Sequence, residues 1–290
     1  MALSAKKRVL ILGASGMLGN TALRFFAGRG IYKTTGTIRS AEVLSHFSEP
    51  LRDCMIAGFD LDDVDGLTKL FDTAAPDVVI NCIGVVKQLA QADDPLTAIP
   101  INSVLPHRLA RLSRAVGARL VHLSTDCVFS GKKGMYREDD FADCDDLYGR
   151  SKYLGEVDYP DSITLRTSII GHELGRSLGL VNWFLSQNDW VNGYTRAIFS
   201  GFPAVEIARI IHDTVIPNPL LRGVYHLSAE PISKFDLLRL IADVYGKAIE
   251  IRPDATVAID RSLDSSRFRE ITGYAPPAWP DLVRVMHEFG

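Results

Sequence analysis

The chain has 290 residues, of which 47% are apolar, and it carries a formal net charge of −3. This length supports one large core or two coupled domains, and the slight acidity gives no basic field for nucleic acid. The apolar runs are too short for a membrane span or a signal peptide. We therefore expect a cytoplasmic protein that binds neither nucleic acid nor membranes. Its four cysteines, without CxxC or zinc spacing, are typical of reduced thiols: Cys54, Cys82, Cys127 and Cys144.

A glycine-rich loop follows the first predicted strand. Residues Val9–Leu12 form a continuous apolar run, which is typical of a parallel strand covered by helices on both faces. The loop has the form GxxGxxG, and a helical pattern comes after it. Between a strand and a helix, such a loop binds a pyrophosphate through backbone N–H groups and the N-terminus of the helix. This order predicts a dinucleotide site formed by Gly13, Ser15, Gly16, Met17, Leu18 and Gly19.

The second predicted strand, Tyr32–Ile38, indicates which dinucleotide binds. Cofactors without a 2′-phosphate usually meet an acidic side chain at the end of this strand, where it binds the ribose hydroxyls. This chain has Arg39 instead, and a guanidinium is suited to a phosphate. We therefore predict NADP(H) in preference to NAD(H). An Arg39 that merely faces solvent is the alternative.

Further cofactor contacts are expected where the later strands end, because ligands bind at the carboxyl edge of an open α/β sheet. A carboxylate after the third strand can accept from an adenine amino group, and Asn102 begins a long helical pattern after the fourth. His107 and His122 have no partner at ligand spacing, so we expect structural histidines and no metal site. The additional cofactor candidates are Asp60, Leu61, Cys82, Ile83, Gly84, Asn102, Ser124, Arg166 and Thr167.

Tyr148 and Lys152 are four residues apart and would share one face of a helix. An ammonium favours the phenolate, so Lys152 would lower the phenol pKa from about 10 towards the range of a proton donor. A tyrosine and a lysine on a solvated helix are the alternative. Thr125 lies near the end of the fifth predicted strand, Arg119–Phe129, and is expected beside a substrate carbonyl and the Tyr148 hydroxyl. These three residues are the catalytic candidates.

From residue 171 onward, glycines and aromatic residues replace the regular alternation of strands and helices. The sequence thus predicts an α/β fold, a Rossmann-type doubly wound parallel sheet with a smaller C-terminal lobe. Residues 1–170 would form the NADP(H)-binding domain, completed by a returning segment near 196–217, and residues 171–290 would mainly bind the substrate. In the lobe, Gly223–Ser228 is a predicted strand, and Ser233–Asp236 is a capping box that opens a helix. The substrate candidates are Val86, Lys87, Thr125, Asp126, Cys127, Trp183 and Arg261, the last of which has pairing with Asp264 as its alternative.

The glycine loop, Ser124-Thr125-Asp126, Tyr148-x-x-x-Lys152 and the variable lobe together resemble the extended short-chain dehydrogenase/reductases. The closer resemblance is to the dTDP-4-dehydrorhamnose reductases, whose Ser-Thr-Asp-Tyr-Val-Phe motif is similar to residues 124–129 and whose Tyr-x-Glu-x-Asp stretch is similar to residues 136–140. Also similar are Arg166-Thr167-Ser168, Gly223-x-Tyr225-His226 and residues 261–267. The resemblance implies NADPH-dependent reduction of a 4-keto-6-deoxy sugar carried on a nucleoside diphosphate, for polysaccharide or O-antigen synthesis.

The resemblance also implies roles for the catalytic candidates. Tyr148 would protonate the forming alkoxide, Lys152 would lower the tyrosine pKa and hold the nicotinamide ribose, and Thr125 would polarise the carbonyl. Cys127 replaces the family's tyrosine, and a cysteine at this place resembles the GDP-fucose synthases, which epimerise the sugar with a thiol base before reducing it. A small buried residue in the tyrosine's place is the alternative. A dehydratase is not expected, because the Asp-Glu pair of the sugar-nucleotide dehydratases is replaced by Asp126-Cys127.

Three further expectations concern the partner acid of Cys127, the role of the whole protein and its assembly. His172 follows the sixth predicted strand, but its spacing does not match the acid of the GDP-fucose synthases. Some proteins that resemble this family serve as cofactor-binding regulatory subunits, such as the β subunit of methionine adenosyltransferase, so a non-catalytic role is a third hypothesis. A homodimer is expected from the prevalence of two-fold oligomers.

Overall fold

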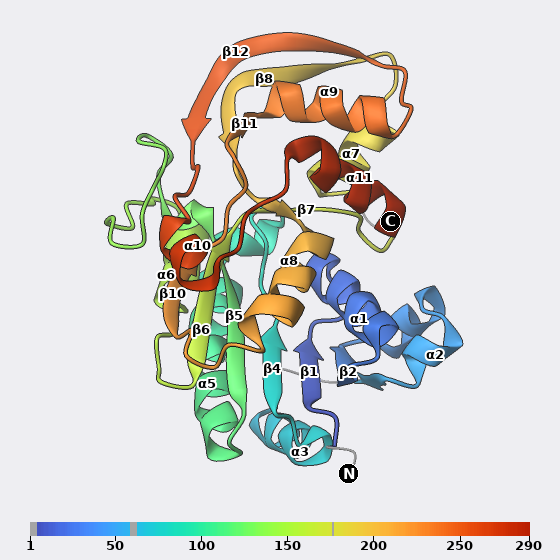
Figure 1. Cartoon of the computed structure of the whole chain (residues 1–290), viewed down its shortest axis with the longest axis vertical. Helices are drawn as coiled ribbons and strands as arrows, with labels where there is room; N and C mark the ends of the chain where they lie inside the picture. Colours follow the sequence, from blue (N-terminus) through green and yellow to red (C-terminus); the bar gives the residue numbers. More distant parts are fainter. Residues whose placement is uncertain (1–4, 59–62, 176) are drawn as a thin grey trace.

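The computed structural model describes residues 5–58, 63–175 and 177–290, and its main feature is a seven-stranded sheet. The strand order is β10-β6-β5-β4-β1-β2-β3, and every neighbouring pair is parallel (Figure 1). This arrangement is the doubly wound Rossmann fold, which confirms the predicted fold class. The strands are β1 (Arg8–Leu12), β2 (Lys33–Ile38), β3 (Met55–Ala57), β4 (Val78–Asn81), β5 (Arg119–Thr125), β6 (Ser162–Thr167) and β10 (Gly223–His226).

Each face of this sheet carries its own hydrophobic core, because successive side chains of a strand point to opposite faces. In β1, Val9 and Ile11 belong to one core, whereas Leu10 and Leu12 belong to the other. Helices α1 and α8 cover the first core, and α3 and α5 cover the second. A strand buried on both faces is apolar throughout, as the sequence pattern indicated. The helices of this part are α1 (Met17–Arg29), α2 (Glu49–Arg52), α3 (Val64–Ala74), α5 (Leu105–Ala115) and α8 (Ala204–Ile210).

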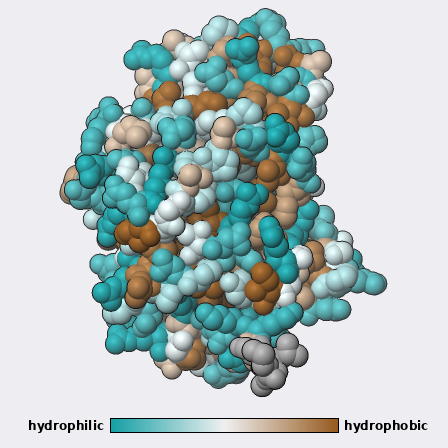
Figure 2. Space-filling model, viewed as in Figure 1, coloured by the Kyte–Doolittle hydropathy of each residue, from teal (hydrophilic) through white to brown (hydrophobic). Residues whose placement is uncertain are grey.

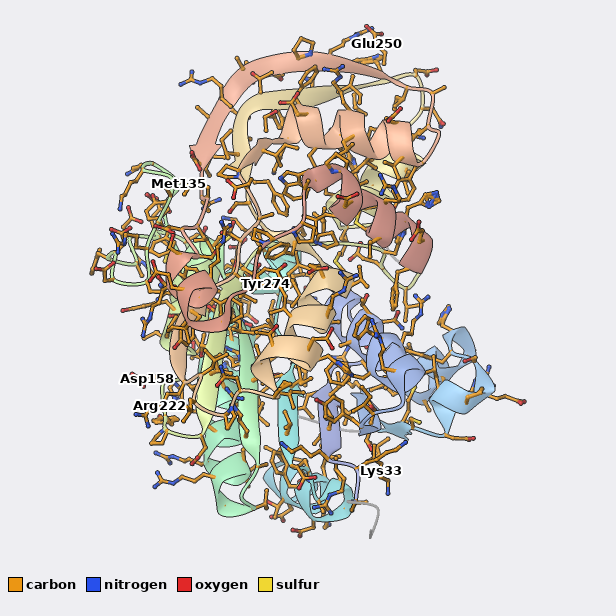
Figure 3. The ribbon with its side chains drawn as sticks, viewed as in Figure 1. Lys33, Met135, Asp158, Arg222, Glu250 and Tyr274 are labelled. Carbon is orange, nitrogen blue, oxygen red and sulfur yellow. The ribbon has the colours of Figure 1, made fainter. Side chains whose placement is uncertain are left out.

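The C-terminal lobe is built on a three-stranded sheet of order β11-β8-β12, which lies above the main sheet in Figure 1. Strands β8 (Trp190–Phe199) and β12 (Glu250–Asp260) run parallel, and α9 (Lys234–Val244) packs on β8. Ser233 Oγ accepts from Asp236 N at 3.0 Å, so the predicted cap is present. Figure 3 shows Glu250 at the outer end of the lobe, where β12 begins. The other elements here are β7 (Ile169–Ile170), α7 (Leu180–Ser186), β9 (Phe202–Pro203), β11 (Ile232–Ser233), α10 (Ser266–Thr272) and α11 (Trp279–Phe289).

Several element boundaries differ from the predictions. Strand β5 ends at Thr125, and residues 126–128 form a short 3-10 turn. The helix predicted from Asn102 already begins with α4 (Pro95–Ala98) and passes through a π-helical turn, Ile99–Val104, into α5. The predicted strand over residues 163–170 is divided into β6 and β7. Strand β10, which the prediction placed in the lobe, pairs with β6 at the edge of the main sheet. Strand pairing depends on residues far apart in the chain, so the local pattern did not reveal it.

A loop over residues 129–146 joins the two parts of the molecule at the carboxyl edge of the main sheet. The carbonyl oxygens of Gly131 and Tyr136 accept from the backbone N–H groups of Asp260 and Asp264 at 2.8 Å each. Met135, labelled in Figure 3, lies on this loop. The end of β12 is therefore held over the ends of the main strands, where the predicted site residues lie.

The molecular surface is of mixed polarity. On the face shown in Figure 2, hydrophobic side chains form small separate groups among hydrophilic ones. Within the described ranges, no helix combines the length and the apolar character that crossing a bilayer requires.

Candidate functional site

The loop between β1 and α1 is shaped to accept a phosphate group. Gly13 has a φ of +82°, in the region that favours glycine, and its carbonyl accepts from Gly16 N at 3.0 Å. A Cβ atom on Gly19 would lie 2.1 Å from Gly13 O, so the close approach of helix to loop requires glycine. The N-cap of α1 is Gly16, which has no side chain to fill the first helical turn. A helix N-terminus of this kind attracts an anion, so these residues fit a dinucleotide pyrophosphate.

The neighbouring strand ends lie close around this loop. Ala14 N donates to Thr37 O at 2.8 Å, which ties the loop to the end of β2. Arg39 follows that strand, and its side chain is exposed. From the other side, Ile83 Cγ1 would lie 2.9 Å from a Cβ atom on Gly13. The loop, Arg39 and the residues after β4 are thus neighbours at one edge of the sheet.

Two of the predicted loop contacts point their side chains elsewhere. Leu18 is buried in the core. The end of Met17 faces the segment before α7, since a Cβ atom on Gly179 would lie 2.8 Å from Met17 Cε. Ser15 is partly buried and Gly16 is exposed. A phosphate in this loop would therefore be held by backbone N–H groups, while Met17 and Leu18 side chains stabilise the fold.

Helix α6 (Leu147–Leu154) carries the Tyr-x-x-x-Lys motif. Its N-cap is Asp146, which accepts from Gly149 N at 2.7 Å. The same carboxylate accepts from Lys87 Nζ at 2.5 Å. Lys87 was predicted to bind the substrate, and its contact in the structure is this ion pair. The pair connects the loop after β4 to the start of α6.

Close packing of α6 brings two catalytic candidates together. A Cβ atom on Gly149 would lie 2.3 Å from Cys127 O, so α6 rests directly on the turn after β5. Thr125 ends β5; its hydroxyl donates to Asp126 Oδ1 at 3.1 Å, and its side chain interacts with that of Tyr148. Both hydroxyls stand at the carboxyl edge of the sheet, where a carbonyl oxygen could receive a hydrogen bond from each.

Lys152 is buried and donates from Nζ to Leu123 O at 2.7 Å. A Cβ atom on Gly84 would lie 3.8 Å from Nζ, so Lys152 also faces the loop after β4. Burial lowers the pKa of Lys152 to about 8. Desolvation, and secondly the neighbouring Cys127, raise the pKa of Tyr148. The expected lowering of the Tyr148 pKa is therefore not observed, because desolvation of the phenolate is the largest influence on it. The neutral phenol is the form that can donate a proton.

The surroundings of Cys127 disfavour a thiolate. Desolvation raises the pKa of Cys127 to about 12, and the neighbouring Asp126 carboxylate contributes in the same direction. Desolvation also raises the pKa of Asp126 itself. A cysteine base must be deprotonated, whereas this thiol stays protonated near neutral pH. His172, which the sequence offered as a partner acid of Cys127, has its Nε2 atom 2.9 Å from the Tyr245 hydroxyl in the lobe.

Two predicted cofactor contacts instead surround a carboxylate that the sequence prediction missed. Ser124 and Arg166 are register partners on β5 and β6. Ser124 Oγ donates to Glu156 Oε1 at 2.7 Å, and Arg166 Nη2 donates to Glu156 Oε2 at 2.6 Å. Both side chains are therefore engaged by Glu156, whose carboxylate compensates the buried charge of Arg166. A signal for Glu156 was present, since it follows Lys152 by four residues.

The remaining cofactor candidates differ in their surroundings. The amide of Asn102 bonds to the backbone N–H and carbonyl of Val85 at 2.9 and 3.2 Å, so it supports the loop after β4. Thr167 is buried, and its hydroxyl donates to the next carbonyl. Cys82 is partly buried, and burial raises its pKa to about 12. Outside the described residues lie Asp60 and Leu61.

Arg261 reaches the site from the end of β12. Its Nε donates to Phe129 O at 2.8 Å, and its charge interacts with Asp126. Asp264 accepts from Ser266 N at 2.8 Å, so the alternative pairing with Arg261 is not what the structure shows. The other substrate candidates are partly or largely exposed: Val86, Lys87 and Trp183, the last on α7.

The two histidines singled out by the sequence have structural partners. His107 Nδ1 lies 2.9 Å from the Tyr159 hydroxyl, and His122 Nδ1 lies 3.1 Å from Asn81 Nδ2. In the part of the chain that the structure describes, no three acidic, histidine or cysteine side chains gather at metal-binding distance.

Comparison with known sequences gives matches along nearly the whole chain. The family model described as RmlD substrate binding domain matches residues 7–286. A dTDP-4-dehydrorhamnose reductase from Aggregatibacter actinomycetemcomitans is 26% identical over 98% of this chain and 93% of its own length. The methionine adenosyltransferase 2 subunit beta of Xenopus laevis is 24% identical over 94% of this chain and 79% of its own length.

Solved structures share the fold. The dTDP-4-dehydrorhamnose reductase of Bacillus anthracis in complex with NADP superposes with a TM-score of 0.81 at 21% identity, covering 99% of each chain. The Bordetella bronchiseptica enzyme WbmG in complex with NAD and UDP has a TM-score of 0.77 at 17% identity, over 98% of this chain and 95% of its own. At such identities, the likeness concerns the fold alone.

Proposed function

The chain belongs to the RmlD substrate-binding domain family, and we propose that it reduces the ketone of a 4-keto-6-deoxy sugar carried on a nucleoside diphosphate, with NADPH as the hydride donor. The observation that carries this proposal is the approach of the Thr125 and Tyr148 side chains, with Lys152 one turn further along α6, at the sheet edge that holds the glycine loop. The similarity to a dTDP-4-dehydrorhamnose reductase over 98% of the chain supports the same reaction. The product would serve polysaccharide or O-antigen synthesis.

The residues present fit a dinucleotide with a 2′-phosphate. Backbone N–H groups of the loop from Gly13 to Gly19 and the N-terminus of α1 would hold the pyrophosphate. Arg39 would bind the 2′-phosphate, and its exposed position at the end of β2 supports this role. When bound, NADPH supplies the hydride. A relative in fold, the Bacillus anthracis reductase, is in complex with NADP.

The protein's own groups would handle the proton. Tyr148 donates its phenolic proton to the carbonyl oxygen as the alkoxide forms, and Thr125 donates a hydrogen bond to the same oxygen. The Lys152 ammonium stabilises the phenolate that results. General acid catalysis of this kind contributes roughly 10²–10⁴-fold to the rate. Hydrogen bonds already aimed at the oxygen lower the barrier further.

The substrate would lie between the main sheet and the lobe. Arg261 extends from β12 to the turn after β5, which supports contact between its guanidinium and the phosphates of the sugar nucleotide. Val86, Lys87 and Trp183 are further proposed contacts. The identity of the base and the sugar would follow from residues of the lobe.

The test is NADPH oxidation by the purified protein with 4-keto-6-deoxy sugars attached to dTDP, UDP and GDP. We expect turnover with at least one of them and a reduced sugar nucleotide as product. Cofactor binding without turnover on any of the three would overturn the reductase proposal. That result would favour a regulatory subunit, for which the likeness to methionine adenosyltransferase 2 subunit beta over 94% of the chain is the supporting observation.

Three broader inferences accompany this proposal. We infer a nucleotide-binding part up to about residue 170 that the later segment 196–217 completes, followed by a mainly substrate-binding part. Because all four cysteines are free thiols, we also infer a cytoplasmic location. A homodimer remains a prediction, and sedimentation analysis of the purified protein would test it.

A further inference from the structure

Glu156 is a buried carboxylate that receives three hydrogen bonds. Ser124 Oγ and Arg166 Nε each lie 2.7 Å from its Oε1, and Arg166 Nη2 lies 2.6 Å from its Oε2. The side chains of Arg166 and Glu156 are 5% and 6% exposed. A bidentate pair in this environment holds its charges at defined positions. Removing one partner of such a pair leaves an uncompensated charge.

The position of Glu156 relates it to the catalytic helix. Tyr148, Lys152 and Glu156 follow one another at intervals of four residues. This spacing places Tyr148 and Lys152 in one row along α6, and Glu156 comes directly after the C-cap, Gly155. Glu156 interacts electrostatically with Lys152.

Among the described residues, few ionisable groups interact electrostatically with Lys152. Strand β4 leads to Cys82, and β5 presents His122 and the Leu123 carbonyl, while Tyr148 lies one turn earlier on α6. Burial raises the pKa of Cys82 to about 12 and lowers the pKa of His122 well below its usual range, so both are neutral near neutral pH. Tyr148 is neutral as well, because desolvation raises its pKa. Among the described residues that interact electrostatically with Lys152, this leaves Glu156 as the anion.

We propose that Glu156 is a positioning residue, whose carboxylate, fixed by Ser124 and Arg166, keeps Lys152 an ammonium ion beside Tyr148. The proposal rests on the reductase function proposed above, in which that ammonium stabilises the phenolate of the proton donor. Without the carboxylate, desolvation favours the neutral amine. The unpaired Arg166 cation would act in the same direction.

Arg166 is anchored on its far side, which keeps the ion pair in place. Its Nη1 lies 3.2 Å from His226 Nε2, and His226 Nδ1 lies 3.0 Å from Tyr136 O. Burial lowers the pKa of His226 to about 3, so the ring is neutral. Its Nδ1–H then donates to Tyr136, and Nε2 accepts from Arg166. The carboxylate of Glu156 is thus connected, through Arg166 on β6 and His226 on β10, to the loop over residues 129–146.

The protonation of Lys152 can be followed directly by NMR titration of the full-length protein labelled with [ε-¹³C]lysine, with Lys152→Met assigning the signal. In Glu156→Gln, which removes the anion and keeps the shape, the Lys152 pKa should fall by roughly one unit or more. In Arg166→Met, which removes the opposing cation, it should rise. In both variants, the alkaline limb of the pH profile of kcat/KM should shift in the same direction as the Lys152 pKa.

A matched control is available in Glu206→Gln. Glu206 is also buried, pairs with Arg209 at 3.0 Å and accepts from the Tyr274 hydroxyl at 2.9 Å, in the region where Figure 3 labels Tyr274. This variant should leave the Lys152 pKa unchanged. An unchanged pKa in Glu156→Gln, or a fall of equal size in the control, would overturn the proposal.

The titration separates this proposal from the proposed reaction, because it needs no substrate. Absence of NADPH turnover refutes the reductase, whereas an unchanged Lys152 titration refutes the role of Glu156. If Glu156→Gln does not fold, Arg166→Met tests the proposal alone, because there the Lys152 pKa is expected to rise. A fall of the Lys152 pKa in Arg166→Met would then sink the idea, and a rise would support it.

Discussion

Asn102 Nδ2 donates to Ser151 Oγ at 3.1 Å, which joins the π-helical turn before α5 to helix α6. The same amide accepts from Val85 N at 2.9 Å and donates to Val85 O at 3.2 Å. Asn102 is only 1% exposed, so water cannot replace these bonds. One side chain therefore ties the loop after β4 to the helix that carries Lys152.

Asn102→Ala should both destabilise the protein and slow the reaction. It leaves the buried backbone groups of Val85 without partners, at a cost of about 1–3 kcal/mol for each group. It also frees the loop that faces Lys152, so kcat should fall more than NADPH affinity. Thermal denaturation and steady-state kinetics measure the two effects. The control Ser151→Ala removes the bond from Asn102 and the one to Tyr148 O but leaves the Val85 backbone groups paired, so it should have the smaller effect on stability. Equal stability of Asn102→Ala and wild type would contradict the role of the amide.

Tyr148→Phe should abolish most of the activity while the cofactor still binds. The substitution removes the proton donor but keeps the ring, so we expect kcat/KM to fall by roughly 10²–10⁴-fold. NADPH affinity, measured by fluorescence titration, should change little. Tyr153→Phe is the matched control, because Tyr153 lies on the same helix with 45% of its surface exposed. Comparable loss in both variants would argue against Tyr148 as the acid.

The decline of kcat/KM at alkaline pH should report the deprotonation of Lys152. Its pKa in the folded protein is lowered by burial to about 8, below that of free lysine, so the cation is lost as the pH rises through that value. Loss of the cation removes stabilisation of the phenolate, so kcat/KM should decline above pH about 8. Because kcat/KM reports the free enzyme, the ligand-free pKa applies. A profile that stays level far above this pH would be inconsistent with a required ammonium.

Cys127→Ser should retain reductase turnover. Desolvation raises the thiol pKa to about 12, so the side chain is a poor base and its replacement by a hydroxyl should be tolerated. Product formed in deuterated water should carry no solvent deuterium beside the reduced carbon in either protein. Mass spectrometry of the product measures this. Deuterium that enters with wild type and not with Cys127→Ser would instead establish the epimerase alternative, with Cys54→Ser as control.

Arg39→Ala should weaken NADPH binding and leave NADH binding nearly unchanged. A hydrogen bond to a charged group contributes about 1.5–3 kcal/mol, so NADPH affinity should drop by roughly tenfold or more. Isothermal titration with both cofactors checks the selectivity. Lys33→Ala provides the control, because Lys33 lies at the amino end of the same strand (Figure 3). If Arg39→Ala weakens the binding of NADPH and NADH equally, Arg39 does not recognise the 2′-phosphate.

Short-range patterns were sufficient to predict the strand–loop–helix unit, the Tyr148–Lys152 row and the helix cap at Ser233. The positive φ of Gly13 and the 2.1 Å approach at Gly19 involve residues only a few positions apart. Such constraints act on neighbouring residues, so they leave a readable pattern in the chain. Together with the alternation of strands and helices, they were enough for the fold class.

Long-range packing decided the rest. Pairing of β5 with β6 turns Ser124 and Arg166 towards Glu156, and pairing of β10 with β6 assigns that strand to the main sheet. The depth at which Tyr148 is packed makes desolvation, and not the cation of Lys152, the dominant influence on its pKa. Register, burial and ion pairing join residues that are distant in the chain. No local pattern of residues records them, so the surroundings of Tyr148 became visible only in the tertiary structure.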